Sequence, residues 1–295
     1  MIRIHGDDGY VTLAVLLIVG LLAAIVSSLL SVSRPALGLA RIGGDQVAAE
    51  ALIQGGVATA GYLLFAAKRE PARVNDMDLR LRTGDIRLAV ADEAGRIDLN
   101  AADPTLLAGL YSTVGGTSLS GQAFAARVVD WRDQDDDVSV GGAEAGDYSG
   151  AEVGYVPPNL PFHSVEELRF LLGLSRRDFE RLAPHLTVFS GRAKIDPLAA
   201  SETVIRAIPG SRPRDLQQIL RARTSGRDRS TLIASMPTLA EFLLDQPSEV
   251  YRVGVRVKLT NGFSDAVEAV IVAPQQGDTD YRVVAWTRLA SAAPE

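Results

Sequence analysis

The feature that most constrains this chain is an uncharged stretch of 24 residues from Tyr10 to Ser33. Most of these residues are apolar, and at about 1.5 Å per helical residue the stretch exceeds the roughly 30 Å hydrocarbon core of a bilayer. It predicts one membrane-spanning helix over residues 10–33. A cleaved secretory signal is the alternative, but its apolar run is usually only about 7 to 15 residues long. Asp7 and Asp8 also stand where such a signal carries positive charge.

The helix is expected to continue beyond the membrane. Residues 36–64 are rich in Ala and Leu with spaced polar residues, which predicts helix to about Lys68. Pro35 and the pair Gly43-Gly44 should bend or loosen it.

Composition excludes several kinds of site. The chain has no cysteine, so disulfides, thiolate zinc, iron–sulfur clusters and a cysteine nucleophile are ruled out, and its three histidines are too scattered to favour a histidine metal site. Motifs for a phosphate loop, a dinucleotide site, a serine-hydrolase elbow and a zincin helix are missing from the sequence. No catalytic residue is therefore predicted, and the chain is not expected to be an enzyme.

Strand patterns occur near both ends of the soluble part. Ile86, Leu88 and Val90 alternate with less apolar residues, and a stricter alternation runs from Tyr251 to Leu259 before the turn signal Asn261-Gly262. Two more apolar runs cover residues 266–272 and 281–287. The last three runs predict an antiparallel meander, completed by the Ile86 strand and the N-terminal helix.

The 150 or so residues between these strands are predicted to form helices and loops. They contain two similar sequence segments, which we call the internal echo. Arg96-Ile97-Asp98, with the apolar residues that follow, matches Lys194-Ile195-Asp196 at a constant offset of 98. A helix start is predicted near Asp103-Pro104 and again near Ser201. The offset is too long for a solenoid and favours a duplicated helical subdomain.

Carboxylates concentrate between Asp130 and Glu152, where eight acids stand against one base in a chain of net charge −6. Asp133, Asp135 and Asp137 have the alternate spacing that opens a calcium loop, and Glu144 falls at the twelfth position, but Val138 replaces the Gly needed at the sixth. The pattern is a broken EF-hand. A solvated acidic loop is the alternative.

A membrane-tethered DNA-binding protein is the rival functional hypothesis. The segment A-I-P-G-S-R-P-R-D-L-Q-Q-I-L-R-A-R, within Ala200–Arg223, resembles the helix-hairpin-helix of competence DNA receptors. Such hairpin amides cradle a phosphate, and nearby positive charge is supplied by Arg206, Arg212, Arg214, Arg221 and Arg223. Ser211-Arg212-Pro213 replaces the second hairpin Gly, however, and the acidic loop would repel DNA. A structural hairpin is favoured, and nucleic acid is not an expected partner.

Three sequence features together resemble another family. The junction G-Y-V-T-L-A at Gly9 to Ala14 is similar to the class III signal of type IV pilins and pseudopilins. The order D-W-x-D-x-D-D, G-G-A-E and P-F-H-S-V-E-E-L, together with D-L-N-A-A-D-P at Asp98 to Pro104, resembles the type II secretion minor pseudopilin K family over nearly the whole chain.

The resemblance implies cleavage between Gly9 and Tyr10 by the prepilin peptidase, with methylation of the new amino terminus. The family's usual Glu at the fifth mature position falls at Ala14, and the K pseudopilins are the members that lack it. Calcium is implied in the acidic loop, with these candidate ligands: Asp133, Asp135, Asp137, Glu144 and Asp147.

The implied fold class is α+β: a long N-terminal transmembrane helix, a pilin-like antiparallel sheet and a large inserted all-α domain with duplicated helical subdomains. The expected parts are a leader (1–9), the transmembrane helix (10–33), the helix continuation and first strands (34–98), the inserted domain (99–240, acidic loop 130–152) and the last strands (241–295). The implied role is a minor pseudopilin at the tip of the pseudopilus that assists its assembly and protein export across the outer membrane. Implied partners are the minor pseudopilins of types I and J and the inner-membrane secretion platform. The implied location is the inner membrane, single-pass, with the C-terminal domain in the periplasm.

Overall fold

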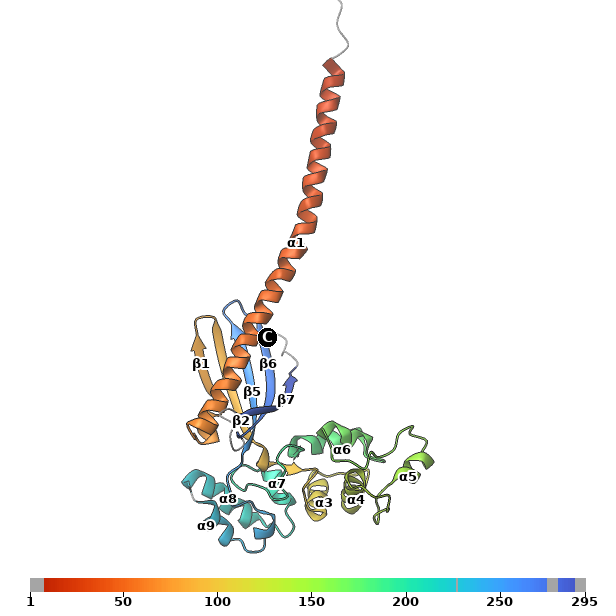
Figure 1. Cartoon of the computed structure of the whole chain (residues 1–295), viewed down its shortest axis with the longest axis vertical. Helices are drawn as coiled ribbons and strands as arrows, with labels where there is room; N and C mark the ends of the chain where they lie inside the picture. Colours follow the sequence, from red (N-terminus) through yellow and green to blue (C-terminus); the bar gives the residue numbers. More distant parts are fainter. Residues whose placement is uncertain (1–7, 227, 275–280, 290–295) are drawn as a thin grey trace, which may run out of the picture.

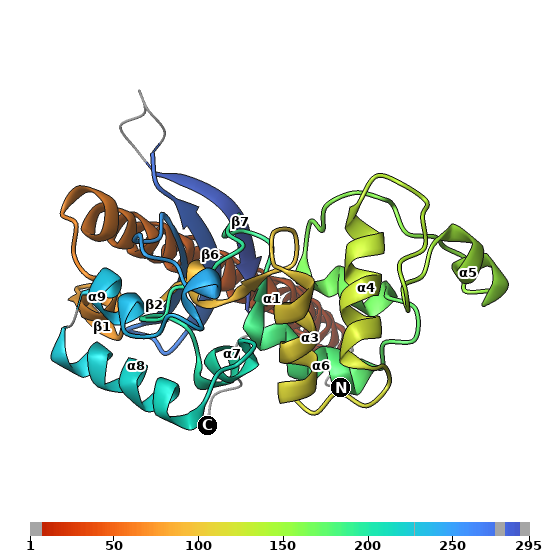
Figure 2. The ribbon, with the colours of Figure 1, turned by 90° about the horizontal axis from the view of Figure 1, so that it is seen from below.

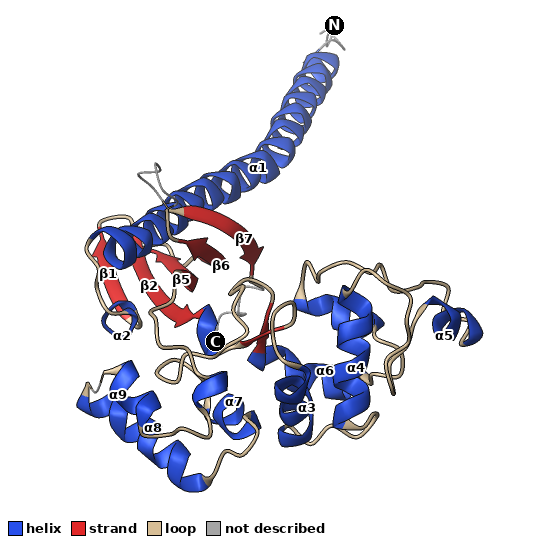
Figure 3. Cartoon of the chain, turned by 60° about the horizontal axis from the view of Figure 1, so that its bottom comes forward, coloured by secondary structure: helices blue, strands red, loops and turns tan. Residues whose placement is uncertain are grey.

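A computed structural model describes residues 8–226, 228–274 and 281–289, so most of the predicted leader lies outside the described residues. The chain begins with α1 (Asp8–Gly61), which passes into a π-helical turn, η1 (Tyr62–Ala66). The predicted continuation of the helix is therefore confirmed. Figures 1 and 3 show the N-terminal half of α1 projecting away from the body, and the helix bends before its C-terminal half reaches the sheet.

Two apolar parts of α1 have different surroundings. Gly43–Ala66 is long and apolar enough to cross a membrane, but 44% of its most apolar window is buried. Thr12–Ser28 is apolar too, and its described side chains are exposed. The predicted span of residues 10–33 extends beyond this segment into residues whose side chains lie outside the description.

The sheet has five antiparallel strands in the order β1-β2-β5-β6-β7. Their bounds are Met77–Leu81 for β1, Gly84–Asp92 for β2, Val250–Leu259 for β5, Ser264–Val272 for β6 and Arg282–Arg288 for β7. The predicted strand at Ile86 and the three-strand C-terminal meander are confirmed. Sequence reasoning missed β1 and the short helix α2 (Pro71–Val74) before it.

The C-terminal half of α1 and one face of the sheet share a core because their periodicities match. Apolar residues recur every three or four positions on the helix and every second position on β2 and β5. The buried set includes Ala49, Ile53, Val57 and Ala60 on α1, Ile86, Leu88 and Val90 on β2, and Val253, Val255 and Val257 on β5. Helix and sheet meet closely at Gly56, where an added Cβ would lie 2.7 Å from a methyl carbon of Val255.

All remaining elements lie between β2 and β5 and form a helical domain with its own core. In chain order they are η2 (Glu93–Gly95), β3 (Ile97–Asp98), α3 (Pro104–Thr113), α4 (Gly121–Arg132), α5 (Ala145–Gly150), η3 (Val165–Phe170), α6 (Arg176–Leu182), η4 (Ala183–His185), β4 (Leu186–Thr187), α7 (Glu202–Ala207), α8 (Pro213–Ser225), α9 (Arg229–Ala234) and η5 (Ala240–Phe242). β3 and β4 pair in parallel, a small sheet that the sequence did not predict.

The predicted helix starts are confirmed at matching points of the internal echo. Asp103 caps α3 by accepting a hydrogen bond from the backbone N–H of Thr105 at 2.8 Å. Ser201, 98 positions later, caps α7 by accepting from the N–H of Val204 at 3.3 Å. Each side chain satisfies an amide that has no partner within its own helix.

A buried polar cluster joins the helical domain to the sheet. Glu93 of η2 is fully buried and accepts a hydrogen bond from Arg252 Nε of β5 at 2.5 Å. Thr187 of β4 donates to the same carboxylate, and Arg252 also pairs with Glu268 of β6. Because a buried charge is costly without such partners, this cluster favours one placement of the domain on the sheet.

Candidate metal centre

The candidate site lies where α4 ends and the acidic loop begins. Asp130, on the last turn of α4, is fully buried, and its Oδ2 accepts hydrogen bonds from the backbone N–H groups of Ser139 at 3.2 Å and Ala143 at 2.9 Å. Gly142 is required here, because an added Cβ would lie 1.9 Å from the same oxygen. These bonds fold the loop back onto α4 and bring its second half beside Asp133.

Five oxygens around this point are buried without a hydrogen-bond partner. They are Asp130 Oδ1, Asp133 Oδ1, both carboxylate oxygens of Glu144 and Asn159 Oδ1. Glu144 is only 3% exposed. A buried carboxylate without a partner is costly, and hard oxygens of this kind are the ligands that calcium takes. The orphaned oxygens are therefore of the donor type that calcium takes.

The pKa shifts of two carboxyl groups at the site also indicate excess negative charge. Burial raises the pKa of Glu144 to about 7, and repulsion from Asp130, Asp133, Asp136 and Asp135 adds to the shift. Burial, followed by repulsion from Asp135 and Asp130, also raises the pKa of Asp133. Both directions mean that negative charge is uncompensated there. A bound cation would supply the missing compensation.

The predicted ligands separate into two groups. Asp133 and Glu144 contribute orphaned oxygens. Asp135, Asp137 and Asp147 are exposed, and two of them have structural partners: Asp135 Oδ1 accepts from the N–H of Asp137 at 3.0 Å, and Asp147 Oδ2 accepts from the N–H of Glu144 at 3.0 Å. Among the residues that the structure describes, no group of three or more His, Asp or Glu side chains already converges in a geometry that could hold an ion.

Asp130 and Asn159 were missed as candidate ligands. Asp130 belongs to the acidic run but stands three positions before the calcium-loop pattern. Asn159 is an amide outside the run, and long-range hydrogen bonds from its Nδ2 to Asp135 O at 2.8 Å and Asp136 Oδ1 at 3.0 Å bring it to the loop. No local pattern in the sequence signals that contact.

Aromatic residues support the loop from the core side. Trp131 is 5% exposed and stacks on Phe162 with ring centroids 5.8 Å apart. Tyr148 of α5 is fully buried, its centroid lies 6.2 Å from that of Trp131, and its hydroxyl accepts from the N–H of Leu172 at 3.0 Å. These contacts fix the start of the loop at Trp131 and its later part at Tyr148.

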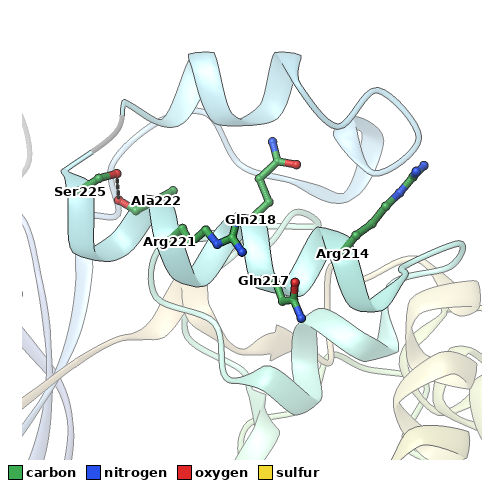
Figure 4. Close-up of a pocket in the computed structure, with 6 residues that line it drawn as sticks. All are labelled: Arg214, Gln217, Gln218, Arg221, Ala222 and Ser225. Atoms are coloured by element: carbon green, nitrogen blue, oxygen red, sulfur yellow. Dashed lines mark hydrogen bonds between the residues drawn. The ribbon is translucent and has the colours of Figure 1, made fainter.

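The arginines of the DNA-binding alternative have other partners. Arg206 pairs with Glu202 at 2.9 Å and Arg212 with Asp215 at 3.0 Å, while Arg223 turns inward to the carbonyl of Pro197 at 2.7 Å. Figure 4 shows Arg214, Gln217, Gln218 and Arg221 along α8, where they line one pocket. These contacts fit a structural hairpin.

The long helix lying along an antiparallel sheet, with a helical domain between neighbouring strands, is the pilin-like α+β fold that was predicted. The family model for type II secretion system protein K matches residues 85–191. Type II secretion system protein K of Pseudomonas aeruginosa is 29% identical over 150 residues, which cover 48% of this chain and 45% of that protein. The match thus spans less than half of the relative's length.

A solved structure has the same fold. A chain from the crystal structure of the GspK–GspI–GspJ complex of the enterotoxigenic Escherichia coli type 2 secretion system superposes with a TM-score of 0.60 at 18% identity, covering 88% of this chain and 99% of that one. The resemblance derived from the sequence is confirmed for the matched region: residues 85–191 are similar to protein K of type II secretion systems, and the chain shares the fold of the superposed structure.

Proposed function

We propose that this chain is the minor pseudopilin at the tip of a type II secretion pseudopilus, where it assists assembly and protein export across the outer membrane. The observation that carries the proposal is the position of the helical domain. It lies at the end of the helix-and-sheet body away from the projecting half of α1 (Figure 1). A domain of this bulk is easier to accommodate at the end of a filament of packed helices than inside its shaft.

The partners proposed are the minor pseudopilins of types I and J, because the superposed chain belongs to a complex of proteins named GspK, GspI and GspJ. The inner-membrane platform and the prepilin peptidase complete the set. Residues 10–33 would cross the inner membrane, with the domains from the sheet onward in the periplasm. In this role the chain is an assembly component without catalysis of its own.

Site-specific crosslinking tests this assignment well because the chain has no cysteine of its own. Val47→Cys places a thiol on α1 at a side chain that is 72% exposed, and Val140→Cys places one in the helical domain at a side chain that is 100% exposed. In assembled pseudopili, Val47→Cys should crosslink to the I or J pseudopilin, whereas Val140→Cys should crosslink to no shaft subunit. Crosslinks from Val140→Cys to major pseudopilins on both sides would rule out the tip position.

We also propose that calcium binds the acidic loop through Asp130, Asp133, Glu144 and Asn159, whose orphaned oxygens support it. The ion would neutralise repulsion that the folded loop otherwise carries. For a ligand that binds only the native state, calcium at 100 times its dissociation constant adds about 2.7 kcal/mol to the free energy of unfolding.

Thermal melting of the full chain in nanodiscs, with calcium or with chelator, tests the site. Calcium should raise the Tm of the wild type. Glu144→Gln and Asp133→Asn should shrink the gap between the two conditions, while the exposed Asp147→Asn serves as the matched control and should keep most of it. Identical wild-type curves in calcium and chelator would leave the loop as a solvated acidic segment.

A further inference from the structure

An exposed apolar surface lies at the end of the helical domain farthest from the sheet. We call it the distal patch and define it as Val153, Tyr155, Val156, Leu160 and Phe170, whose exposed fractions are 36%, 38%, 49%, 48% and 49%. The segment begins directly after α5, which Figure 2 shows at the outer end of the domain.

The patch is concentrated rather than scattered. In the described part of the helical domain, every exposed large apolar side chain falls between residues 138 and 170, and Val138 and Val140 precede the distal patch along the chain. Single exposed apolar residues are ordinary on a protein surface, but a contiguous group usually marks an interaction site. The remainder of the domain buries its large apolar side chains in its own core.

Ring contacts hold the patch on a rigid base. Tyr155 packs edge-on against Phe170 with centroids 5.4 Å apart, and its other neighbour is the buried Tyr148 at 5.8 Å. Leu160 follows Asn159, which is bonded to Asp135 and Asp136. The exposed rings are thus held in place before any partner arrives, which lowers the entropy lost on binding.

Most charged side chains in the segment that carries the patch are acidic, and Arg169, next to Phe170, places its guanidinium over the ring of Phe179, 4.5 Å from the ring centroid. Between residues 133 and 168 the chain has no Lys or Arg, and it has these nine acids: Asp133, Asp135, Asp136, Asp137, Glu144, Asp147, Glu152, Glu166 and Glu167. An anionic lipid surface would be repelled. A protein surface with basic residues around an apolar centre would be complementary in both respects.

We propose that the distal patch is a docking site for a partner protein whose contact surface has an apolar centre and a basic rim, with Tyr155 and Phe170 as the central anchors. The proposal goes beyond the assembly role and requires no particular position in the pseudopilus. Calcium at the neighbouring loop is not part of the contact, since Asp136, Asp137 and Glu152 are exposed and stay available to a basic rim.

The test uses the full chain in zwitterionic nanodiscs, with calcium held constant and empty nanodiscs subtracted. Three fluorescent helical peptides serve as probes: one with a leucine face and lysine flanks, one with the same leucine face and glutamate flanks, and one with serine in place of leucine and the same lysines. Anisotropy should show saturable binding of the leucine–lysine peptide, with about tenfold or more weaker binding of the other two.

Variants then locate the contact. Val156→Ser and Phe170→Ser should each weaken binding of the leucine–lysine peptide about tenfold at a temperature where both variants remain folded, whereas Val283→Ser on β7, 45% exposed, is the matched control and should bind as the wild type does. Asp137→Asn with Glu152→Gln should also weaken it, and Glu241→Gln should not.

Three results would overturn the proposal. They are the absence of binding by the leucine–lysine peptide, equal binding of the glutamate peptide, and an equal loss in Val283→Ser. Flotation of the nanodiscs with phosphatidylcholine vesicles in a Phe170-dependent manner would assign the patch to a lipid surface instead.

Discussion

Asp98 and Asp196 lie 98 residues apart and close the same turn in the two halves of the helical domain. Each is buried, and each accepts a hydrogen bond at 2.8 Å from the backbone N–H two residues later, Asn100 in one case and Leu198 in the other. The backbone carbonyl of each also accepts from the residue four positions on, Ala102 or Ala200. The repeated sequence pattern therefore corresponds to a repeated pattern of hydrogen bonds.

The matching hydrogen bonds at Asp98 and Asp196 predict that two arginines have equivalent structural roles. Arg132, ending α4, donates to the carbonyls of Leu99 and Ala102, and Arg223 of α8 donates to those of Pro197 and Ala200. Arg132→Met and Arg223→Met should each lower the free energy of unfolding by about 2 kcal/mol, since each leaves two buried carbonyls without their charged donor. Lys should rescue poorly, because it lacks the planar fork.

Chemical denaturation measures these losses, and Arg221→Met is the matched control for α8. Arg221 is exposed two positions before Arg223, so its replacement should change stability by less than about 0.5 kcal/mol. A loss in Arg221→Met equal to that in Arg223→Met would remove the structural distinction between the two arginines.

Asp178 is predicted to support stability in its ionised form. It is fully buried, and its Oδ2 accepts hydrogen bonds from Tyr111, Thr117 and Ser118. Burial by itself would raise its pKa, but the bonds from Ser118, Tyr111 and Thr117 hold the pKa well below its usual range. Asp178→Asn should therefore lower the free energy of unfolding at pH 7 by about 2 kcal/mol.

The sign of the pH dependence follows from the depressed pKa. The contribution of Asp178 is present above the ordinary carboxyl pKa and is lost as the pH falls through the lower value of the folded state. Denaturation series from pH 7 to pH 2 should therefore show the wild type losing its advantage over Asp178→Asn in acid. Asp85→Asn, exposed on β2, should follow the wild type throughout.

Asp92 is predicted to behave in the opposite way. It lies at the end of β2, and burial raises its pKa to about 6, although hydrogen bonds from Ser248 and Ala94 oppose the shift. A raised folded pKa means that stability is lost as the pH rises from about 4 through about 6. Asp92→Asn retains an acceptor for the N–H of Ala94 and cannot ionise, so it should be more stable than the wild type at pH 7.5 and gain nothing at pH 3.5.

Thermal melting at the two pH values checks this, with the exposed Asp245→Asn as control. An equal gain at both pH values would mean that Asn improves packing rather than removing a charge.

The proposed processing site predicts a single cleavage, between Gly9 and Tyr10. Gly9→Val should leave an uncleaved precursor in the membrane, whereas Gly20→Val, within the same helix and with open space around it, should still be cleaved between Gly9 and Tyr10. Mass spectrometry of the mature chain measures the product. A mature chain starting between Ile25 and Ala40 would point to ordinary signal-peptide cleavage and contradict the membrane anchor.

The residue at position 14 gives a test of the proposed location at the tip of the pseudopilus. In the pseudopilin resemblance, a Glu at this mature position would pair with the amino terminus of a neighbouring subunit, since an unpaired charge in lipid is costly. Ala14 cannot do so, and Ala14→Glu should still insert and be cleaved but no longer be confined to the tip. Crosslinks from Val47→Cys should then extend to major pseudopilins on both sides. Wild-type chain already found along the shaft would contradict the tip assignment directly.

The sequence predicted the elements that local periodicity controls. The long helix and the strands from Val250 to Arg288 follow from spacings that a chain shows without its tertiary contacts. β1 was missed because it is an edge strand of only five residues that buries little. β3 and β4 were missed because two-residue strands, 89 positions apart at Ile97 and Leu186, leave no periodic signal.

In the candidate site, too, local spacing predicted some residues, while others depend on tertiary contacts. Asp133 and Glu144 came from a spacing rule, and both have orphaned oxygens. Asp135 fits the same rule and Asp147 came from the family resemblance. Asp135 accepts a local hydrogen bond from the N–H of Asp137 and Asp147 accepts one from the N–H of Glu144, so they serve as turn and cap residues. The contact of Asn159 depends on a loop that returns across the domain, which only the folded chain reveals.

The placement of the helical domain has a consequence for how such a chain can change over time. The domain leaves the sheet after Asp92 and returns at Val250, and Asp92 is directly opposite Tyr251 in the antiparallel register of β2 and β5. Those two strand ends could be joined by a hairpin turn of a few residues without altering one registered pair. The helix-and-sheet body and the helical domain can therefore evolve independently. Insertions and deletions at the junction between β2 and β5 can enlarge, reshape or remove the helical domain while the body continues to fold.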